Sequence, residues 1–250
     1  MNIVVAFKVV PDDQDIQVAA DRSLDYSKAK NTVSTYDLNA FEAATQLAGA
    51  DDKVIAVTVG PKSIDESKLK KNVLARGAEE LFMIADDACD GLDAHATAEQ
   101  LATLIGKVGG CDLVICGDGS ADNYAQQVDV QLASKMGVPV VNAARKIDVA
   151  DGAVVIERLL EDDIETVRVP LPAVVSVVPD IAVPRIPGMR DILAAGKKPM
   201  NVAAADVASA SALETVSCLA PEQAERKLDI ADATDEGAIE KFAAALKAAL

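Results

Sequence analysis

The sequence contains no tryptophan, a single histidine and few other aromatic residues, with three tyrosines and four phenylalanines in 250 residues. The four cysteines form no CxxC pair and cannot make a Cys/His zinc set with one histidine, so we expect reduced, mostly buried thiols. No serine or cysteine nucleophile pattern surrounds His95, which is expected to be a structural helix residue. The residue content therefore indicates neither a metal site nor a hydrolase-type catalytic centre.

Long hydrophobic runs are also missing. Half of the residues are hydrophobic, yet no uninterrupted apolar stretch approaches the roughly 20 residues that a membrane span requires. The start, MNIVVAFKVV, lacks the basic region, long apolar stretch and cleavage site of a signal peptide, and reads as a first β-strand. We therefore expect a cytoplasmic protein without direct membrane insertion.

Basic residues are in the minority, with 24 Lys and Arg against 40 Asp and Glu and a formal net charge of −16. A nucleic-acid surface needs clustered Lys and Arg to neutralise phosphates. Here the basic residues are scattered, and the densest cluster is Lys68, Lys70 and Lys71. We therefore expect no nucleic-acid partner.

Apolar runs of strand length alternate with amphipathic helical segments as far as Val140. This alternation is typical of an α/β protein with a Rossmann-like, mostly parallel sheet covered by helices on both faces. The expected strands cover residues 3–9, 54–59, 80–84 and 113–116. The expected helices cover residues 37–47 and 93–108, with one more ending near residue 77 and another near residue 136.

The pattern changes after Val140. Residues 144–178 alternate apolar and polar side chains around an Asp151-Gly152 turn, which is typical of antiparallel strands. We therefore expect an antiparallel meander that closes the sheet and that includes the apolar segment LPAVVSVV.

The C-terminal fifth of the chain predicts an arm. From about Ala203 the sequence is Ala-rich and strongly acidic, and it cannot build a core of its own. Residues 235–250 have apolar side chains at helical spacing, which predicts an amphipathic helix with Thr234 or Asp235 near its N-cap. We therefore divide the chain into an α/β nucleotide-binding domain, residues 1–202, and a C-terminal arm, residues 203–250, that contacts a partner subunit.

The segment after the fourth strand is a candidate binding loop, because ligands of open parallel sheets bind beyond the carboxyl ends of strands. Gly117 and Gly119 precede a helix there and could offer backbone N–H groups and a positive helix end to a phosphate. GDGSAD is neither a GxGxxG fingerprint nor a Walker loop. An ordinary capped turn with Asp122 near the N-cap explains the segment equally well.

Other strand ends have weaker signals. Residues 34–37, just before a helix, suit ribose or adenine contacts, although a simple N-cap role explains Asp37 equally well. Lys8 is expected to be a solvated lysine, and the Arg76-Gly77 pair needs no more than helix C-capping to explain it.

Seven segments are more informative together, in their order along the chain, than any of them is alone: VVAFKVVPD, YDLNAFEAA, VIAVTVGP, ARGAEEL, DLVICGDGSADNYAQQV, LPAVVSVV and PRIPGMRDILAAGKK. In this order they resemble the beta, or small, subunit of electron-transfer flavoproteins, and the similarity runs over nearly the whole chain. The chain is most similar to the Fix or carnitine-metabolism branch, for which VPD followed by DQDI and the GDGS form are typical.

The resemblance implies an electron-transfer subunit without catalytic residues of its own. Such a subunit packs with a larger alpha subunit, whose mobile FAD domain carries electrons from an acyl-CoA-type or related dehydrogenase to a quinone reductase or ferredoxin-type acceptor. The beta site holds AMP in simple carriers and a second FAD in bifurcating forms, which accept hydride from NADH. Residues 10–13 lack the bulky aromatic typical of AMP forms and so favour FAD, whereas Asp118 adds negative charge beside a diphosphate.

The resemblance also assigns residues to two sites. The nucleotide site comprises Ala6, Ser34, Thr35, Tyr36, Asp37, Val59, Gly117, Asp118, Gly119, Ser120, Ala121, Asp122, Asn123, Tyr124, Ala125, Gln126, Gln127 and Val128. The partner-docking loop falls on residues 185–198, where Arg185, Met189 and Ile192 are expected to contact a dehydrogenase, with Met189 as the apolar anchor.

This sequence departs from the family pattern inside the nucleotide loop. Asp118 and Gly119 stand where family members often have a basic or amide side chain, so we expect backbone N–H groups to make the phosphate contacts. Ser34-Thr35 replaces the common Asn-Pro pair, and Asp129 replaces a glycine.

Two other function classes remain open from the sequence. A universal-stress-type ATP- or AMP-binding module could use GDGS as its phosphate loop, but it leaves the meander and the acidic arm unexplained. A free-standing NADH-dependent flavin oxidoreductase would need a complete dinucleotide fingerprint, which the sequence lacks.

Overall fold

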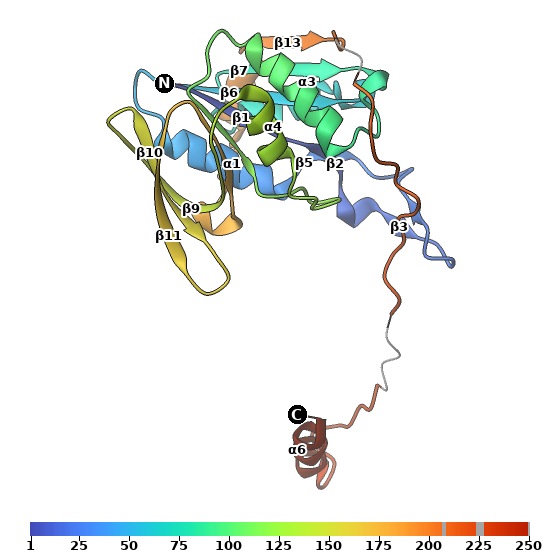
Figure 1. Cartoon of the computed structure of the whole chain (residues 1–250). Coiled ribbons are helices and arrows are strands. Elements are labelled where there is room, and N and C mark those ends of the chain that lie inside the picture. Colours follow the sequence, from blue (N-terminus) through green and yellow to red (C-terminus); the bar gives the residue numbers. More distant parts are fainter. Residues whose placement is uncertain (207–208, 224–227, 250) are drawn as a thin grey trace.

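A computed structural model of the chain describes residues 1–206, 209–223 and 228–249 (Figure 1). The strands of its main sheet are β1 (Asn2–Ala6), β6 (Lys53–Gly60), β7 (Glu80–Ala85), β8 (Leu113–Gly117), β9 (Val140–Ala150), β10 (Ala153–Leu159), β11 (Ile164–Pro170), β12 (Ala173–Val177) and β13 (Met200–Ala203). Their order across the sheet is β11-β10-β9-β12-β8-β1-β6-β7-β13. The predicted α/β class with a large, mostly parallel sheet is therefore confirmed.

Two small antiparallel pairs and four short 3₁₀ turns lie around this sheet. The pairs are β2 (Val9–Pro11) with β5 (Asn31–Val33), and β3 (Gln17–Val18) with β4 (Leu24–Asp25). The turns are η1 (Asp13–Asp15), η2 (Lys62–Ile64), η3 (Asp87–Cys89) and η4 (Pro179–Ile181).

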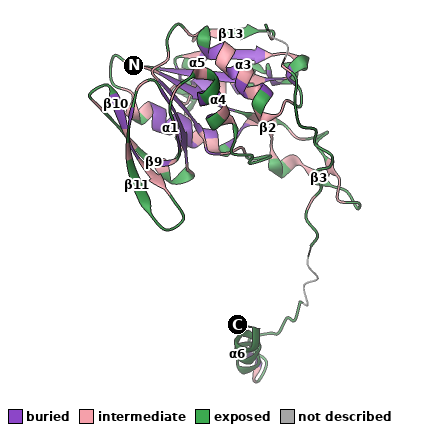
Figure 2. Cartoon of the chain, in the orientation of Figure 1, coloured by how far each residue is buried: buried purple, intermediate pink, exposed green. Residues whose placement is uncertain are grey.

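Helices cover both faces of the main sheet. One face packs against α1 (Thr35–Leu47), α2 (Ser67–Leu74) and α5 (Met189–Ala195), and the other against α3 (Ala94–Gly106) and α4 (Val128–Met136). Burial on both faces explains why the central strands are almost wholly apolar (Figure 2).

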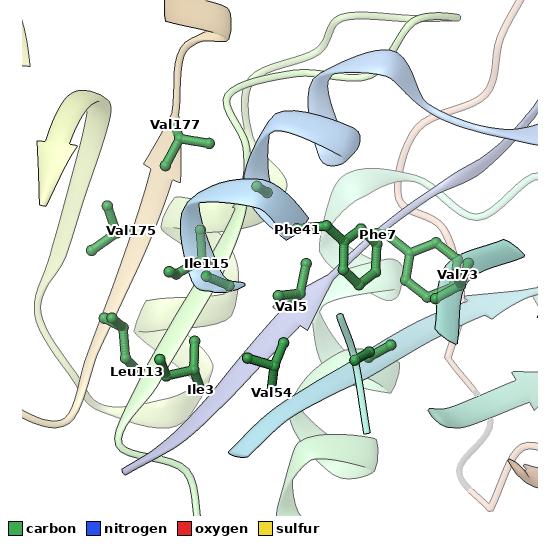
Figure 3. Packing of buried hydrophobic residues seen from close by; sticks show 14 of the residues in the cluster. Ile3, Val5, Phe7, Phe41, Val54, Val73, Leu113, Ile115, Val175 and Val177 are labelled. Carbon is green, nitrogen blue, oxygen red and sulfur yellow. The ribbon is translucent and has the colours of Figure 1, made fainter. Parts of the chain in front are cut away.

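The alternation of side chains along β1 distributes them between the two cores. Ile3 and Val5 point towards α1 and belong to the same cluster as Phe41 (Figure 3). Val4 and Ala6 belong to the cluster beneath α3 and α4. Because both faces of β1 are buried, the strand is held firmly in the sheet, and the segment at its carboxyl end starts from a fixed position.

The sheet reverses its winding direction beside β1. Val4 lies opposite Ile55 on β6 and opposite Val114 on β8, and both neighbours run parallel to β1. The chain leaves β1 for β6 and β7 on one side and then crosses back to β8 on the other. Ligands of open α/β sheets bind beyond the carboxyl strand ends at such a switch point.

Two elements beside this switch point differ from the sequence prediction. The first strand ends at Ala6, because the chain turns at Lys8, whose carbonyl accepts the N–H of Ser34. The helix after β8 begins only at Val128, with Gln127 as its N-cap residue, and ends at a left-handed Gly137 as expected. Residues 118–127 therefore form a loop, and the N-cap role considered for Asp122 is wrong.

β12 occupies a different place from the one predicted. β9, β10 and β11 form the expected antiparallel ribbon, with Asp151 and Gly152 in its first turn. β12 instead lies between β8 and β9 and runs parallel to both. All of its residues are buried, as in a central strand of a parallel sheet, so its assignment to the meander is wrong.

The chain after β13 follows the body before it leaves it. Asp93, the N-cap residue of α3, accepts the N–H groups of Ala212 and Leu213, and Ser23 forms a bridge with Leu219. Beyond these contacts, α6 (Ala238–Ala249) lies apart from the sheet (Figure 1). It starts after the predicted N-cap residues Thr234 and Asp235, which belong to the preceding turn.

None of the described helices has the length and hydropathy that crossing a bilayer would require.

Candidate functional site

The carboxylate of Asp37 joins the ends of two strands at the switch point. Its Oδ2 accepts the backbone N–H of Lys8 at 2.7 Å, and its Oδ1 accepts the backbone N–H of Gly117 at 2.9 Å. Lys8 follows β1 and Gly117 ends β8, so one buried side chain from the first turn of α1 fixes the distance between the two loops. Ser34 is the N-cap residue of α1, and the N-cap alternative for Asp37 is therefore wrong.

Burial of Asp37 raises the pKa of its carboxyl group to about 7. The two backbone hydrogen bonds and the charge of Lys8 act in the opposite direction, while the charge of Asp122 adds to the increase. Desolvation exceeds the stabilisation of the charged form, so this carboxyl group changes protonation state near neutral pH.

Ser34 connects α1 to the loop of residues 118–127. Its buried hydroxyl oxygen accepts the N–H of Ala121 at 3.2 Å, and its own N–H donates to the carbonyl of Lys8 at 3.0 Å. Segments that lie far apart in the sequence are thus hydrogen-bonded to one another around the end of β1.

Two glycines allow the close approach of these segments. A Cβ atom on Gly117 would lie 2.7 Å from the Cβ of Tyr36 and 2.9 Å from Oδ1 of Asp37. A Cβ atom on Gly119 would lie 2.3 Å from the ring of Tyr124. A larger residue at position 117 would push apart α1 and the end of β8, and one at position 119 would displace the ring of Tyr124 within the loop.

A tyrosine from the first turn of α1 contacts a tyrosine of the loop of residues 118–127. The rings of Tyr36 and Tyr124 have centroids 5.0 Å apart and are tilted by 45°. The hydroxyl of Tyr124 donates to Oδ2 of Asp118 at 2.8 Å, and this hydrogen bond is the main reason that the pKa of Tyr124 rises to about 12. Tyr124 therefore remains a protonated donor, and its other ring surface is half exposed.

The loop contains two carboxylates in different surroundings. Asp118 is buried, which raises the pKa of its carboxyl group, and its Oδ1 has no hydrogen-bond partner among the described residues. Asp122 forms an ion pair with Lys8, whose Nζ lies 2.5 Å from Oδ2. Lys8 is exposed, as expected of a solvated lysine, but its ion pair also places it at the edge of the candidate site.

The first turn of α4 is hydrogen-bonded to the neighbouring strand β12. Asp129 is buried, and its Oδ2 accepts the hydroxyl of Ser176 on β12 at 2.6 Å. Gln127 forms no side-chain cap hydrogen bond, so the N–H groups of the first turn of α4 need other partners. Such a helix end attracts an anion.

The remaining predicted residues lie around the same edge. Ala6 is the buried last residue of β1, and Val59 is on β6, beyond the Val57 that pairs with Ala6. Ser120 and Val128 are half-buried. Exposed positions are Thr35, Ala121, Asn123, Ala125, Gln126 and Gln127. His95 lies elsewhere and contacts Gln131 and Lys135 between α3 and α4.

The predicted docking loop is fastened at one end and exposed at the other. The guanidinium of Arg185 forms two hydrogen bonds with the carboxylate of Glu42, at 2.6 and 3.0 Å, and lowers the pKa of that group to about 2. Arg76 donates to the carbonyl of Arg185 at 2.7 Å, so its role exceeds the predicted C-capping. Met189 is 79% exposed at the start of α5.

Two hollows lie between α2 and α5, away from the carboxyl edge. One, of about 230 Å³, is lined by Ala75, Gly77, Arg185, Asp191, Ala194 and Lys198. The other is an open groove of about 470 Å³ lined by Ser67, Lys68, Lys71, Asn72 and Ile192. Neither includes a residue of the carboxyl-edge site, so they belong to the docking-loop surface.

No group of three or more His, Cys, Asp or Glu side chains suited to a metal ion occurs within the described ranges.

A family model, described as the electron transfer flavoprotein domain, matches residues 23–208. The matched span contains α1, the loop of residues 118–127 and α5. Of the carboxyl-edge site, β1 and Lys8 lie before this span.

Proposed function

The chain belongs to the electron transfer flavoprotein family, and on this premise we propose that it is the beta, or small, subunit of such a protein, of the Fix or carnitine-metabolism branch. In this proposal it binds an adenine nucleotide at the carboxyl edge of its sheet. With an alpha subunit it passes electrons from an acyl-CoA-type or related dehydrogenase to a quinone reductase or another acceptor. Family membership argues against the universal-stress-type module, and the lack of a complete dinucleotide fingerprint argues against a free-standing oxidoreductase.

The observation that supports the nucleotide site best is the convergence of three loops at the switch point. Asp37 holds the end of β1 to the end of β8, and Ser34 links the loop of residues 118–127 to the segment after β1. The first turn of α4 provides positive potential for a phosphate, whereas the charge of Lys8 is paired with Asp122. The tyrosine pair provides an aromatic surface for a planar ring.

We favour FAD over AMP as the nucleotide, by a small margin. Val10 is buried and no bulky aromatic residue occupies positions 10–13, where a flavin ring would need room. Asp118 and Asp122 add negative charge near a diphosphate, but Lys8 neutralises Asp122. The charge argument against FAD therefore rests on Asp118 alone. When bound here, FAD would supply hydride and electron transfer, while this chain would bind and orient it.

The nucleotide content of the purified heterodimer tests this function. We expect two flavins and no AMP per heterodimer when the complex is purified without added flavin, denatured and analysed by absorbance and chromatography. One flavin with one AMP would refute the FAD assignment and any bifurcating role, but it would leave the beta-subunit proposal intact. One flavin without any adenylate would refute the nucleotide site itself.

The surface around α5 is proposed to dock the dehydrogenase. Met189 is exposed beside Leu193 and Ile186, and the groove lined by Ile192 has Lys68 and Lys71 on its rim. An adaptable apolar anchor with cationic surroundings suits an acidic partner with an apolar pocket. The pair between Arg185 and Glu42 holds this loop in place instead of contacting the partner through a free charge.

Substitution Met189→Ala is expected to slow electron transfer from the cognate dehydrogenase by about 10-fold or more, as truncation of a central interface anchor does. The melting temperature and the flavin content should stay unchanged because the side chain makes little contact with its own chain. Ile164→Ala, which removes an exposed apolar side chain from β11, serves as the matched control. A large drop in melting temperature for Met189→Ala would instead show that the residue is structural.

A further inference from the structure

Asp118 has a feature that the scaffold role does not explain. Its side chain is 9% exposed, and its Oδ2 accepts the hydroxyl of Tyr124 at 2.8 Å. Its Oδ1 is buried and has no hydrogen-bond partner among the described residues. An unpaired buried polar atom costs roughly 1–3 kcal/mol, and more for a charged group, so a well-folded protein rarely keeps one without a use.

The other buried carboxylate at the switch point shows the contrast. Asp37 uses both oxygens, one for the N–H of Lys8 and one for the N–H of Gly117. Asp37 therefore completes the scaffold, whereas Asp118 has one acceptor left over at the same edge of the sheet.

We propose that Oδ1 of Asp118 accepts a hydrogen bond from a ribose hydroxyl group of the bound adenine nucleotide. This inference rests on the proposed function, in which the carboxyl edge binds such a nucleotide, and it adds the orientation of the ligand. The hydroxyl-bearing face of the ribose lies at Asp118, while the phosphate lies towards the first turn of α4.

The charges at the site favour a hydroxyl over a phosphate beside Asp118. Tyr124 donates to Oδ2, which indicates that the carboxyl group acts as an acceptor, and the negative charge of Asp129 in the first turn of α4 contributes to the raised pKa of Asp118. An acidic acceptor repels phosphate but binds sugar hydroxyls, as acidic residues do at the ribose of dinucleotide-binding sheets. The cation of the site, Lys8, lies instead beside Asp122.

The loop above Asp118 has to open to admit the ligand, and few contacts hold it closed. They include the hydrogen bond from Tyr124 to Asp118, the ring contact of Tyr124 with Tyr36, the ion pair of Lys8 with Asp122, and the hydrogen bond between Ser34 and Ala121. Exposed ion pairs contribute little, typically about 0–1 kcal/mol. Tyr124 and Gln126 also have left-handed backbones, with φ of 44° and 54°, which adds strain to the closed loop.

The test measures binding of AMP, 2′-deoxy-AMP and 3′-deoxy-AMP to the nucleotide-free heterodimer by calorimetry. AMP is the portion shared by both candidate ligands. We expect the unaltered protein to bind at least one deoxy compound about 10-fold more weakly than AMP, the size expected for one hydrogen bond to a charged group. Asp118→Ala should bind AMP about 10-fold more weakly and should no longer distinguish it from that deoxy compound.

Two controls separate the possible outcomes. Asp148→Ala removes an exposed carboxylate from β9 and should retain the discrimination between AMP and its deoxy forms. Asp118→Asn keeps the side-chain shape if the alanine variant does not fold, and it should lose part of the discrimination. Full discrimination in the Asp118 variants would overturn this inference and leave the nucleotide site standing. Absence of AMP binding to the unaltered heterodimer would overturn both.

Discussion

A chain that ends at Gln223 is expected to keep its α/β sheet and to lose its alpha subunit. The deletion removes α6, whose Ile239, Phe242 and Leu246 recur at helical spacing on one face and are all exposed. Phe242, for example, is 67% exposed. A helix of this length is marginal in water by itself, so we expect its apolar face to pack against a partner.

The expected loss is large because three large apolar side chains would become buried in the complex. At roughly 1.5–3 kcal/mol for each fully buried side chain, removal of α6 weakens association by about three orders of magnitude or more. Co-expression followed by affinity purification of the alpha subunit and size-exclusion chromatography measures this directly.

The cut after Gln223 separates partner binding from folding better than a cut at residue 203. Residues 204–222 include Ala212, Leu213 and Leu219, which contact α3 and the chain near Ser23, and Ala203 itself belongs to β13. Phe242→Asp should reproduce the loss of the partner, whereas Lys241→Ala, on the same helix, should not. A truncated chain that still elutes as a stable 1:1 complex with the alpha subunit would contradict the proposal that the C-terminal arm binds the partner.

Replacement of Asp37 by alanine is expected to lower the free energy of unfolding of the full chain by roughly 2–5 kcal/mol. The substitution leaves the N–H groups of Lys8 and Gly117 buried without an acceptor, and each unsatisfied buried donor costs about 1–3 kcal/mol. Urea unfolding followed by far-UV circular dichroism gives the difference. Asp122→Ala removes an ion pair and local hydrogen bonds with Ser120 and Asn123 at the loop surface, and should cost less than Asp37→Ala.

The variant Asp37→Asn tests the protonation of the same group. The pKa of Asp37 in the folded protein, about 7, lies above its ordinary value of 3.8. Protonation therefore stabilises the fold; this contribution is fully present below the unfolded pKa and is lost as pH rises through about 7. The asparagine variant has no such dependence, so its stability relative to the unaltered protein should improve as pH increases from about 5.5 to 8. A difference that is constant over this range would show that Asp37 does not titrate there.

Much of the fold could be predicted from periodicity, and the place of β12 shows where periodicity stops. The alternation of residues 144–170 correctly predicts the antiparallel ribbon. The segment that becomes β12 is a continuous apolar run, AVVSV, which is typical of a strand buried on both faces. That signal was present in the sequence, but it does not specify which two strands the segment separates.

The candidate site divides in the same way. Its loops could be predicted because ligands of parallel sheets bind at carboxyl ends of strands. The ion pair of Lys8 could not be predicted, because its partner Asp122 lies 114 positions further along the chain and no local pattern links the two residues. The unpaired oxygen of Asp118 is also invisible in the sequence, because it depends on which neighbours the folded loop brings to it.

The position of β12 also constrains the order in which the sheet can be completed during synthesis. β8 is made early, yet its second neighbour is β12, and the whole β9–β11 ribbon emerges from the ribosome before that strand. The edge of β7 waits even longer, until β13 is made. A nascent chain that ends before residue 173 therefore exposes two apolar strand edges at once, and such edges pair readily with other chains.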